Sequence, residues 1–198
     1  RTTDGKGRVG DLSASALARL DAGARFTTDG GLSFPFRGRG IGVPRLDDVL
    51  AALTLVPLLI EIKEPAALIP TVDLLEKHGA VERCVVASSH HAGVAPARGG
   101  ALRTGASTRD AAGLLLSLHG PATVPFDALC IPPRHYGVPL PMRTFVARAR
   151  RAGAVTHVWT VNDVREARHL WSIGVLGIIT DVPDIMAAAR DTAGPAAR

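Results

Sequence analysis

Leu58-Leu59-Ile60-Glu61-Ile62-Lys63 decides the fold, because a short apolar run ends there in two charges of opposite sign. A short run of this kind, rich in branched aliphatic residues, predicts a buried strand. Glu61 and Lys63 are two positions apart, so on a strand their side chains point to the same face. If that face is the inside of a barrel, the charges are costly unless they are paired or bound to a ligand. The pair therefore predicts either a metal ligand beside a phosphate-neutralising cation or a structural salt bridge.

The same apolar pattern recurs along the rest of the chain. Six strands are predicted, over residues 58–62, 83–87, 101–104, 128–131, 155–160 and 176–180. Helices are predicted over residues 66–78, 109–118, 142–152, 164–173 and 185–190, with an irregular or helical link after the second strand. Before the first strand we expect mainly loops, a helix over 14–20 capped by Ser13, and a helix over 46–52. Near-continuous Val, Ile and Leu runs are typical of parallel strands buried on both faces.

Repeated strand–helix units leave two main architectures, an open doubly wound sheet and a closed barrel. No Gly-x-Gly-x-x-Gly turn follows the first strand, which disfavours a dinucleotide-binding sheet. A (β/α)8 barrel has eight strands and roughly 250 residues, so this chain of 198 residues is two strands short. It starts with Arg1 in a loop, not with Met. We therefore expect an α/β TIM-type barrel lacking its first two strands, with residues 1–198 forming one domain of six βα units, about three quarters of the whole.

The strand ends carry the other candidate residues, because sites of parallel α/β proteins form there. Trp159 lies at the end of the fifth predicted strand and is predicted either to form an apolar wall for a substrate or to pack in the core. Asn162 or Asp163 is predicted to cap the next helix. His90 and His91 are adjacent, so their side chains point in different directions, and a loop role is favoured over a zinc site.

Composition excludes several classes of protein. The formal charge is +5 and aromatic residues make up only 4% of the chain, with no basic run interleaved with aromatics, so nucleic acid is a poor partner. Cys84 and Cys130 lie in apolar stretches and are predicted to be buried thiols. The longest apolar run, residues 49–60, is too short to span a bilayer. With no export signal in view, a cytoplasmic location is expected.

An ordered set of motifs resembles the glycerophosphodiester phosphodiesterase family over nearly the whole chain. The matching stretches are Arg1-Thr2-Thr3-Asp4-Gly5-Lys6-Gly7-Arg8-Val9, Leu20-Asp21-Ala22-Gly23, Val43-Pro44-Arg45-Leu46-Asp47-Asp48-Val49-Leu50, Ile60-Glu61-Ile62-Lys63, Trp159-Thr160-Val161-Asn162 and Gly177-Ile178-Ile179-Thr180-Asp181-Val182-Pro183. Each motif is weak by itself, whereas the ordered set is specific.

The resemblance implies a barrel enzyme that cleaves small glycerophosphodiesters to glycerol 3-phosphate and an alcohol, with a divalent cation, usually calcium or magnesium. It implies that Glu61 is a metal carboxylate, that Lys63 is a catalytic cation facing the phosphate, and that Trp159 lines the glycerol side of the pocket. Hard oxygen ligands suit these metals, and a metal with a lysine would stabilise charge on the phosphoryl oxygens.

The sequence also departs from the family pattern. The family's two catalytic histidines lie in His-Arg-Gly and His-Asp motifs, with two more metal carboxylates between them, and none of these has a counterpart from Arg1 onward. His90 stands where Phe is usual, and Arg45 where Thr is usual. The parent protein is therefore expected to be an enzyme and this segment to be inactive alone. The alternatives are a lipid phosphodiesterase resembling lysophospholipase D or sphingomyelinase D, and a non-catalytic barrel module.

Overall fold

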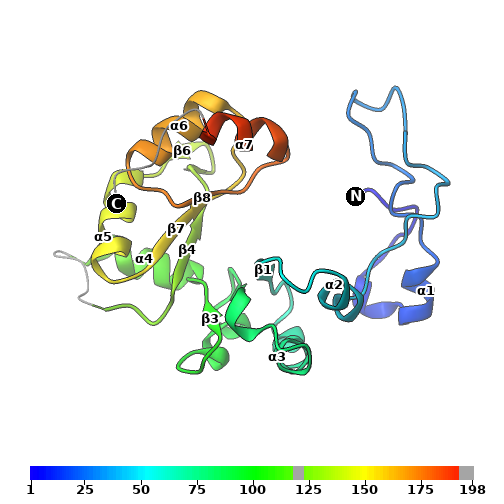
Figure 1. Ribbon diagram of the computed structural model, residues 1–198, viewed down its shortest axis with the longest axis horizontal. Helices are drawn as coiled ribbons and strands as arrows, with labels where there is room; N and C mark the ends of the chain where they lie inside the picture. Colours follow the sequence, from blue (N-terminus) through cyan, green and yellow to red (C-terminus); the bar gives the residue numbers. More distant parts are fainter. Residues whose placement is uncertain (118–122, 192–198) are drawn as a thin grey trace. The chain divides into compact units, whose positions relative to one another are not determined.

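The structure is a computed structural model that describes residues 1–117 and 123–191 (Figure 1). Its residues group into two compact units, an N-terminal unit over Arg1–Thr54 and a C-terminal unit over Leu55–Arg198. The single barrel domain expected over residues 1–198 stays a prediction.

The N-terminal unit consists mainly of loops, as predicted. Its regular elements are the 3-10 helix η1 (Val9–Asp11) and the helices α1 (Ala14–Ala18) and α2 (Leu46–Ala52). The Ser13 side chain accepts a hydrogen bond from the Ala16 backbone N–H at 3.1 Å, so it caps α1 as the sequence indicates.

One carboxylate organises the loops of this unit. Asp21 accepts hydrogen bonds from the backbone N–H groups of Gly23 at 2.9 Å and Gly38 at 2.8 Å. Its own N–H donates to Oδ1 of Asp4 at 3.0 Å. A Cβ at Gly23 would lie 2.3 Å from the Phe36 carbonyl oxygen, so only glycine fits this close approach. The Asp-Ala-Gly motif is therefore a loop-building element.

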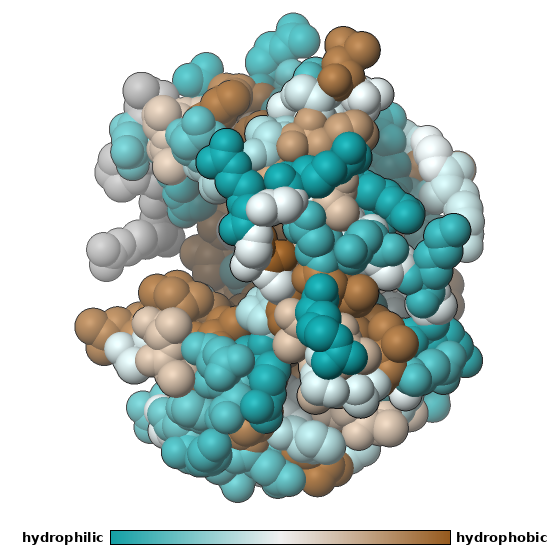
Figure 2. Space-filling view, turned by 90° about the vertical axis from the view of Figure 1, so that its right-hand side faces the viewer, coloured by the Kyte–Doolittle hydropathy of each residue, from teal (hydrophilic) through white to brown (hydrophobic). Residues whose placement is uncertain are grey.

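The N-terminal unit buries few apolar side chains. Ala24 and Leu50 are its buried hydrophobic residues, whereas Leu32, Phe36 and Ile41 are exposed. In Figure 2, hydrophobic residues lie at the surface in several separate places among hydrophilic ones. Hydrogen bonds in the loops therefore contribute much of the order in this unit.

The C-terminal unit contains the six predicted strands, all paired in parallel. They are β1 (Leu58–Glu61), β2 (Cys84–Ala87), β3 (Arg103–Thr104), β4 (Ala128–Ile131), β7 (Val155–Val158) and β8 (Gly177–Ile178). The hydrogen-bonded orders are β1-β2-β3 and β4-β7-β8, and a parallel bridge between Gly105 and Ala128 joins β3 to β4. The strands therefore follow one another in chain order.

Helices follow the strands as predicted, with bounds that differ by a few residues. They are η2 (Pro65–Ala67), α3 (Leu68–Lys77), η3 (Val81–Arg83), η4 (His91–Gly93), η5 (Ala95–Ala97), α4 (Thr108–Leu116), α5 (Met142–Arg151), α6 (Val164–Ser172) and α7 (Pro183–Asp191). The predicted helix over 109–118 extends to Leu118, which lies outside the described residues. Within the described ranges, no helix has the length and apolar character needed to cross a bilayer.

The core lies between the strands and these helices. One cluster joins β7 to α6 and α7 through Val158, Leu170 and Met186. A second joins β4 to α4 and α5 through Leu129 and Phe145.

Arg148 ties the second cluster together at a helix end. Its Nη1 donates to the carbonyl oxygens of Leu114 at 2.8 Å and Leu115 at 2.6 Å. These carbonyls belong to the last turn of α4, where an α-helix has no backbone N–H groups left to pair with them. The guanidinium on α5 therefore closes the C-terminus of α4.

The prediction that every strand is buried on both faces is wrong for β1. Leu59 on this strand is 40% exposed, and Val155 on β7 is exposed on the equivalent face. Within the described residues β1 pairs only with β2, and β8 only with β7. A parallel strand is covered on both faces only where a second layer lies on it, and the helices cover one face here.

A short hairpin was not predicted. Strands β5 (Arg134–His135) and β6 (Val138–Pro139) pair antiparallel between β4 and α5. Tyr136 and Gly137 at the turn have φ of 47° and 79°, the pattern of a two-residue turn with both residues left-handed. The usual signal for this turn is Asn-Gly or Asp-Gly, and Tyr-Gly does not give it.

We expect Leu129→Ala to lower the free energy of unfolding by about 2–5 kcal/mol, because it opens a cavity in the second core cluster. Leu129 is 0% exposed in that cluster. Leu116→Ala is the matched control, because the Leu116 side chain is 79% exposed and its loss should change stability little. Urea denaturation monitored by circular dichroism measures both. Equal, small changes would contradict the placement of Leu129 in the core.

Candidate active site

The site begins at the end of β1, where Glu61 and Lys63 are in direct contact. The Lys63 Nζ lies 2.7 Å from Oε2 of Glu61, and the two side chains are 77% and 45% exposed. An exposed pair of this kind contributes at most about 1 kcal/mol, so an incoming anion or cation can displace either partner. The salt bridge that the sequence allowed is therefore present. Binding of a metal by Glu61 stays a prediction.

The Glu61 side chain shares a face with Cys130 of β4. Burial raises the pKa of the Cys130 thiol, and the Glu61 carboxylate raises it further, to about 11. β2 and β3 separate the strands of these two residues, so the shared face follows from the parallel register from β1 to β4. The sequence predicted a buried thiol at Cys130, but the residue is only partly buried, because it faces this open side of the sheet.

His157 joins the same face from β7. It pairs in register with Cys130 on one side and Gly177 on the other. A Cβ at Gly177 would lie 2.2 Å from His157 Nδ1, so the imidazole rests directly on this glycine. Burial lowers the pKa of His157, which favours the neutral ring. His157 was not among the site residues predicted from the sequence. Its position could have been inferred, because it lies two residues before Trp159 and therefore on the same face of the strand.

Trp159 follows directly after β7. Its backbone N–H donates to the Ile131 carbonyl at 3.2 Å, which extends the pairing of β7 with β4. Its side chain is 43% exposed, so it is not core packing alone. A ring that is half exposed at a strand end is available as an apolar wall, although its contact with a substrate stays a prediction.

Asn162 ties the loop after β7 to the loop after β8. Its Oδ1 accepts from Thr180 Oγ1 and from the Asp181 N–H, both at 2.9 Å, and its Nδ2 donates to Asp181 Oδ2 at 3.0 Å. The cap of α6 is Asp163, which accepts from the Glu166 N–H at 2.8 Å. Of the two residues considered as the cap, Asp163 has that role and Asn162 holds the loops.

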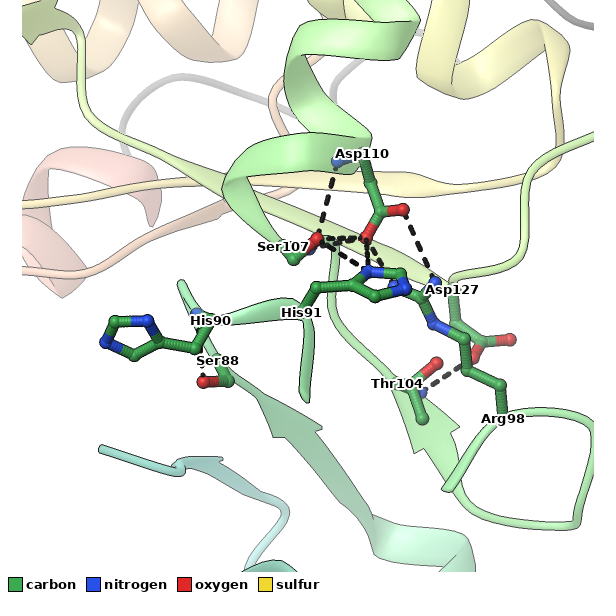
Figure 3. A network of polar contacts seen from close by, with 8 residues as sticks. All are labelled: Ser88, His90, His91, Arg98, Thr104, Ser107, Asp110 and Asp127. Carbon is green, nitrogen blue, oxygen red and sulfur yellow. Dashed lines mark hydrogen bonds and ion pairs between the residues drawn. The ribbon is translucent and has the colours of Figure 1, made fainter. Parts of the chain in front are cut away.

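A second polar network lies at the start of α4 (Figure 3). Ser107 and Asp110 form a reciprocal capping box, and Arg98 forms an ion pair with Asp110. Burial by itself would raise the pKa of Asp110, but hydrogen bonds from Arg98 and Ser107 outweigh it and lower the pKa. The network therefore holds the link between β2 and β3 against the start of α4.

His91 gives this network the residue types of a Ser-His-Asp triad. Its Nδ1 lies 3.3 Å from Ser107 Oγ and 4.0 Å from Asp110 Oδ2. The Ser107 hydroxyl, however, donates to Asp110 Oδ2 at 2.6 Å and is buried, so it serves the helix cap and not as a nucleophile. The His90 and His91 rings point in different directions in Figure 3.

A divalent metal needs several oxygen or nitrogen ligands that converge. In residues 1–117 and 123–191, no three His, Cys, Asp or Glu side chains come together in a group that could hold one. Glu61 offers a single exposed carboxylate. The described residues therefore do not form a metal site by themselves.

Comparison with known proteins finds a sequence family to which part of the C-terminal half of the chain is similar. Residues 102–185 match the sequence model of the glycerophosphoryl diester phosphodiesterase family. This segment includes Cys130, His157 and Trp159, whereas Glu61 and Lys63 lie before it. A Mycobacterium tuberculosis protein named probable glycerophosphodiester phosphodiesterase 2 is 29% identical over 161 residues. The match covers 75% of this chain and 60% of that relative.

Solved structures of related proteins share the fold. The glycerophosphoryl diester phosphodiesterase domain of a Mycobacterium tuberculosis protein is 21% identical, with a TM-score of 0.77 over 96% of this chain and 79% of that one. The glycerophosphodiester phosphodiesterase of Agrobacterium tumefaciens is 27% identical, with a TM-score of 0.65 over 95% and 76%. An Oleispira antarctica phosphodiesterase, solved with the product sn-glycerol-3-phosphate, is 20% identical, with a TM-score of 0.69 over 96% and 75%. The chain therefore has the TIM-type α/β fold of these proteins.

The buried position of His157 predicts a pH-dependent stability. Its folded pKa is lowered, so the unfolded chain binds a proton more readily. The neutral, partly buried His157 therefore contributes to the free energy of unfolding. This contribution is complete above the pKa of about 6.5 that histidine has in the unfolded chain, and it is lost as the pH falls through the lower pKa of the folded state. We expect His157→Gln to remove this part of the pH dependence of the free energy of unfolding, and His135→Gln, at an exposed position, to retain it.

Urea denaturation at a series of pH values measures the stability, and NMR titration of the imidazole measures the pKa. A His157 pKa at or above the value of the unfolded chain would contradict its burial against Gly177.

Proposed function

Because the chain is a relative of the glycerophosphoryl diester phosphodiesterases, we propose that it is part of an enzyme that hydrolyses glycerophosphodiesters to glycerol 3-phosphate and an alcohol. The observation that supports this most directly is the exposed Glu61–Lys63 pair at the carboxyl edge of the parallel strands. The relative it matches is longer, since the matched region is 60% of that protein. The activity is therefore proposed for the complete protein that contains this segment.

Lys63 is proposed to bind the phosphate. Its ammonium lies at the strand end where substrates of TIM-type proteins are held, and its side chain is 77% exposed. During hydrolysis, water attacks phosphorus, the ester bond to the alcohol breaks, and negative charge grows on the phosphoryl oxygens. A cation fixed beside these oxygens stabilises that charge. The substrate is a small molecule, and Trp159 is proposed to line its glycerol side.

Glu61 is proposed as one oxygen ligand of a divalent cation, calcium or magnesium. A carboxylate oxygen is the ligand type that these cations prefer, and a bound cation would neutralise phosphate charge. The remaining ligands, the general acid and the general base would come from other parts of the complete protein. We also propose that two further strands precede β1 there, since β1 pairs only with β2 among the described residues. Residues 1–198 alone are expected to be inactive.

An assay of the complete gene product on two substrates tests the function. Release of glycerol 3-phosphate from glycerophosphocholine supports the proposal. Release of choline from lysophosphatidylcholine alone would instead indicate a lysophospholipase D-like enzyme. No turnover of either substrate with calcium or magnesium present would indicate a non-catalytic module. Residues 1–198 assayed in parallel test whether the segment is inactive alone.

We expect Lys63→Ala in the complete protein to lower kcat by about 10²–10³, the usual cost of removing one group that stabilises transition-state charge. Lys6→Ala removes an exposed lysine far from this position in the sequence and is the control. Steady-state kinetics on glycerophosphocholine measure the effect. A wild-type kcat for Lys63→Ala would remove this residue from the site.

Glu61→Gln is expected to raise the metal concentration needed for half-maximal activity by about tenfold or more. Mutation of a residue that only hydrogen-bonds to a metal ligand already lowers metal affinity or activity by about 10–100-fold. Glu82→Gln, an exposed acidic residue in η3, is the matched control. Activity is titrated against added magnesium or calcium after chelation. An unchanged titration curve for Glu61→Gln would exclude it as a ligand.

A further inference from the structure

A basic hollow lies on the surface of α5, between this helix and the end of α6. Its volume is about 630 Å³, and it is lined by Arg143, Val146, Ala147, Arg150, Arg151 and Ile173. Val146 is buried and Ile173 partly buried, so they form an apolar floor, whereas the arginines are exposed at the rim. No acidic residue lines it. We refer to these six residues as the α5 groove.

The helical spacing builds this groove. Arg143 and Arg150 are seven positions apart, which is about two turns, so they lie on one side of α5. Ala147 falls between them, and its small side chain leaves the space open. The other wall is the turn after α6, where a Cβ at Gly174 would lie 3.2 Å from Val146 Cγ1. This close approach, with φ of +98° at Gly174, fixes the groove as part of the fold.

Helix stability does not account for all of this charge. Arg150 and Arg151 lie in the last turn of α5, where cations are favourable, but Arg143 lies in the first turn, where the helix dipole disfavours a cation. The first turn contains no acidic residue. Within residues 1–117 and 123–191, the guanidinium groups of Arg143 and Arg150 have no hydrogen-bond or ion-pair partner. Arg148 on the same helix differs, since it binds two carbonyls of α4.

The segment that contains α5 and α6 carries much of the net positive charge of the chain, and three of its arginines line the groove. Residues 142–172 contain six arginines, no lysine and two acidic residues, a balance of +4, while the full chain has +5. The guanidinium group forms two parallel hydrogen bonds with a phosphate, which lysine does not. Nucleic acid would need aromatic stacking surfaces, and none lines the groove. A ligand surface with several phosphate groups above apolar carbon atoms would be complementary to the groove, in which arginines surround an apolar floor.

We propose that the α5 groove docks this protein on an anionic phospholipid bilayer. Arg143 and Arg150 bind lipid phosphate groups, and the glycerol or acyl carbons of the lipid rest on Val146 and Ile173. Neighbouring arginines on a protein surface are attracted to the negative charge of an anionic leaflet. This attraction does not require a helix that crosses the membrane. The inference goes beyond the proposed hydrolysis and holds whether or not the chain turns over a substrate.

Co-sedimentation of residues 1–198 with vesicles tests the docking. We expect binding to vesicles of phosphatidylcholine mixed with phosphatidylglycerol, and none to phosphatidylcholine alone. The double variant Arg143→Gln/Arg150→Gln should bind the mixed vesicles about thirtyfold more weakly, from the usual contribution of each arginine near an anionic leaflet. Arg19→Gln/Arg39→Gln makes the same change in net charge at exposed positions of the N-terminal unit and should bind like the wild type. Circular dichroism confirms that each variant is folded.

Three results would overturn the proposal. Equal losses in the two double variants would show attraction by net charge alone. Binding of inorganic phosphate, lost in Arg143→Gln/Arg150→Gln, without binding to either vesicle would show a site for a small anion. Binding of a single-stranded oligonucleotide that depends on these arginines, again without vesicle binding, would show a nucleic-acid surface. None of these measurements involves turnover, so they are independent of the assay of hydrolysis.

Discussion

The parallel register of the strands is the constraint on which the candidate site depends. Parallel pairing brings the carboxyl ends of β1, β4, β7 and β8 to the same edge, and strand alternation sends every second side chain to the same face. Glu61, Cys130 and His157 share a face for this reason alone. A slip of one residue in β7 would turn His157 and Trp159 toward the helices and replace them with Val158.

Hydrogen bonds between loops hold the strand ends that this register aligns. The buried Ser88 hydroxyl donates to the Ile62 carbonyl at 2.7 Å and so joins the ends of β2 and β1. Asn162 joins the loops after β7 and β8, and the Ser107–Asp110 box with Arg98 fixes the start of α4. A site built from side chains on separate strands needs such supports, because a shift of about 1 Å is costly for chemistry.

Arginine serves two different purposes in this chain. The terminal nitrogens of Arg98 and Arg148 are paired inside the C-terminal unit, with a carboxylate and with helix carbonyls respectively. Arg143 and Arg150 point from the same region toward solvent around an apolar floor. The planar guanidinium suits both environments, since it binds carbonyls, carboxylates and phosphates in a fixed geometry. Arginine content by itself therefore does not distinguish a structural role from a binding role.

The sequence by itself determined the six strands, their helices and the α1 and α6 caps, because these depend on local periodicity and on hydrogen bonds between near neighbours. It also placed Glu61, Lys63 and Trp159 at strand ends. Tertiary structure alone decided that Leu59 is exposed, that Glu61 and Cys130 share a face across two intervening strands, and that His157 rests on Gly177. Each of these follows from which strands and layers become neighbours in space. These contacts join residues that are far apart in the chain, so no local sequence pattern predicts them.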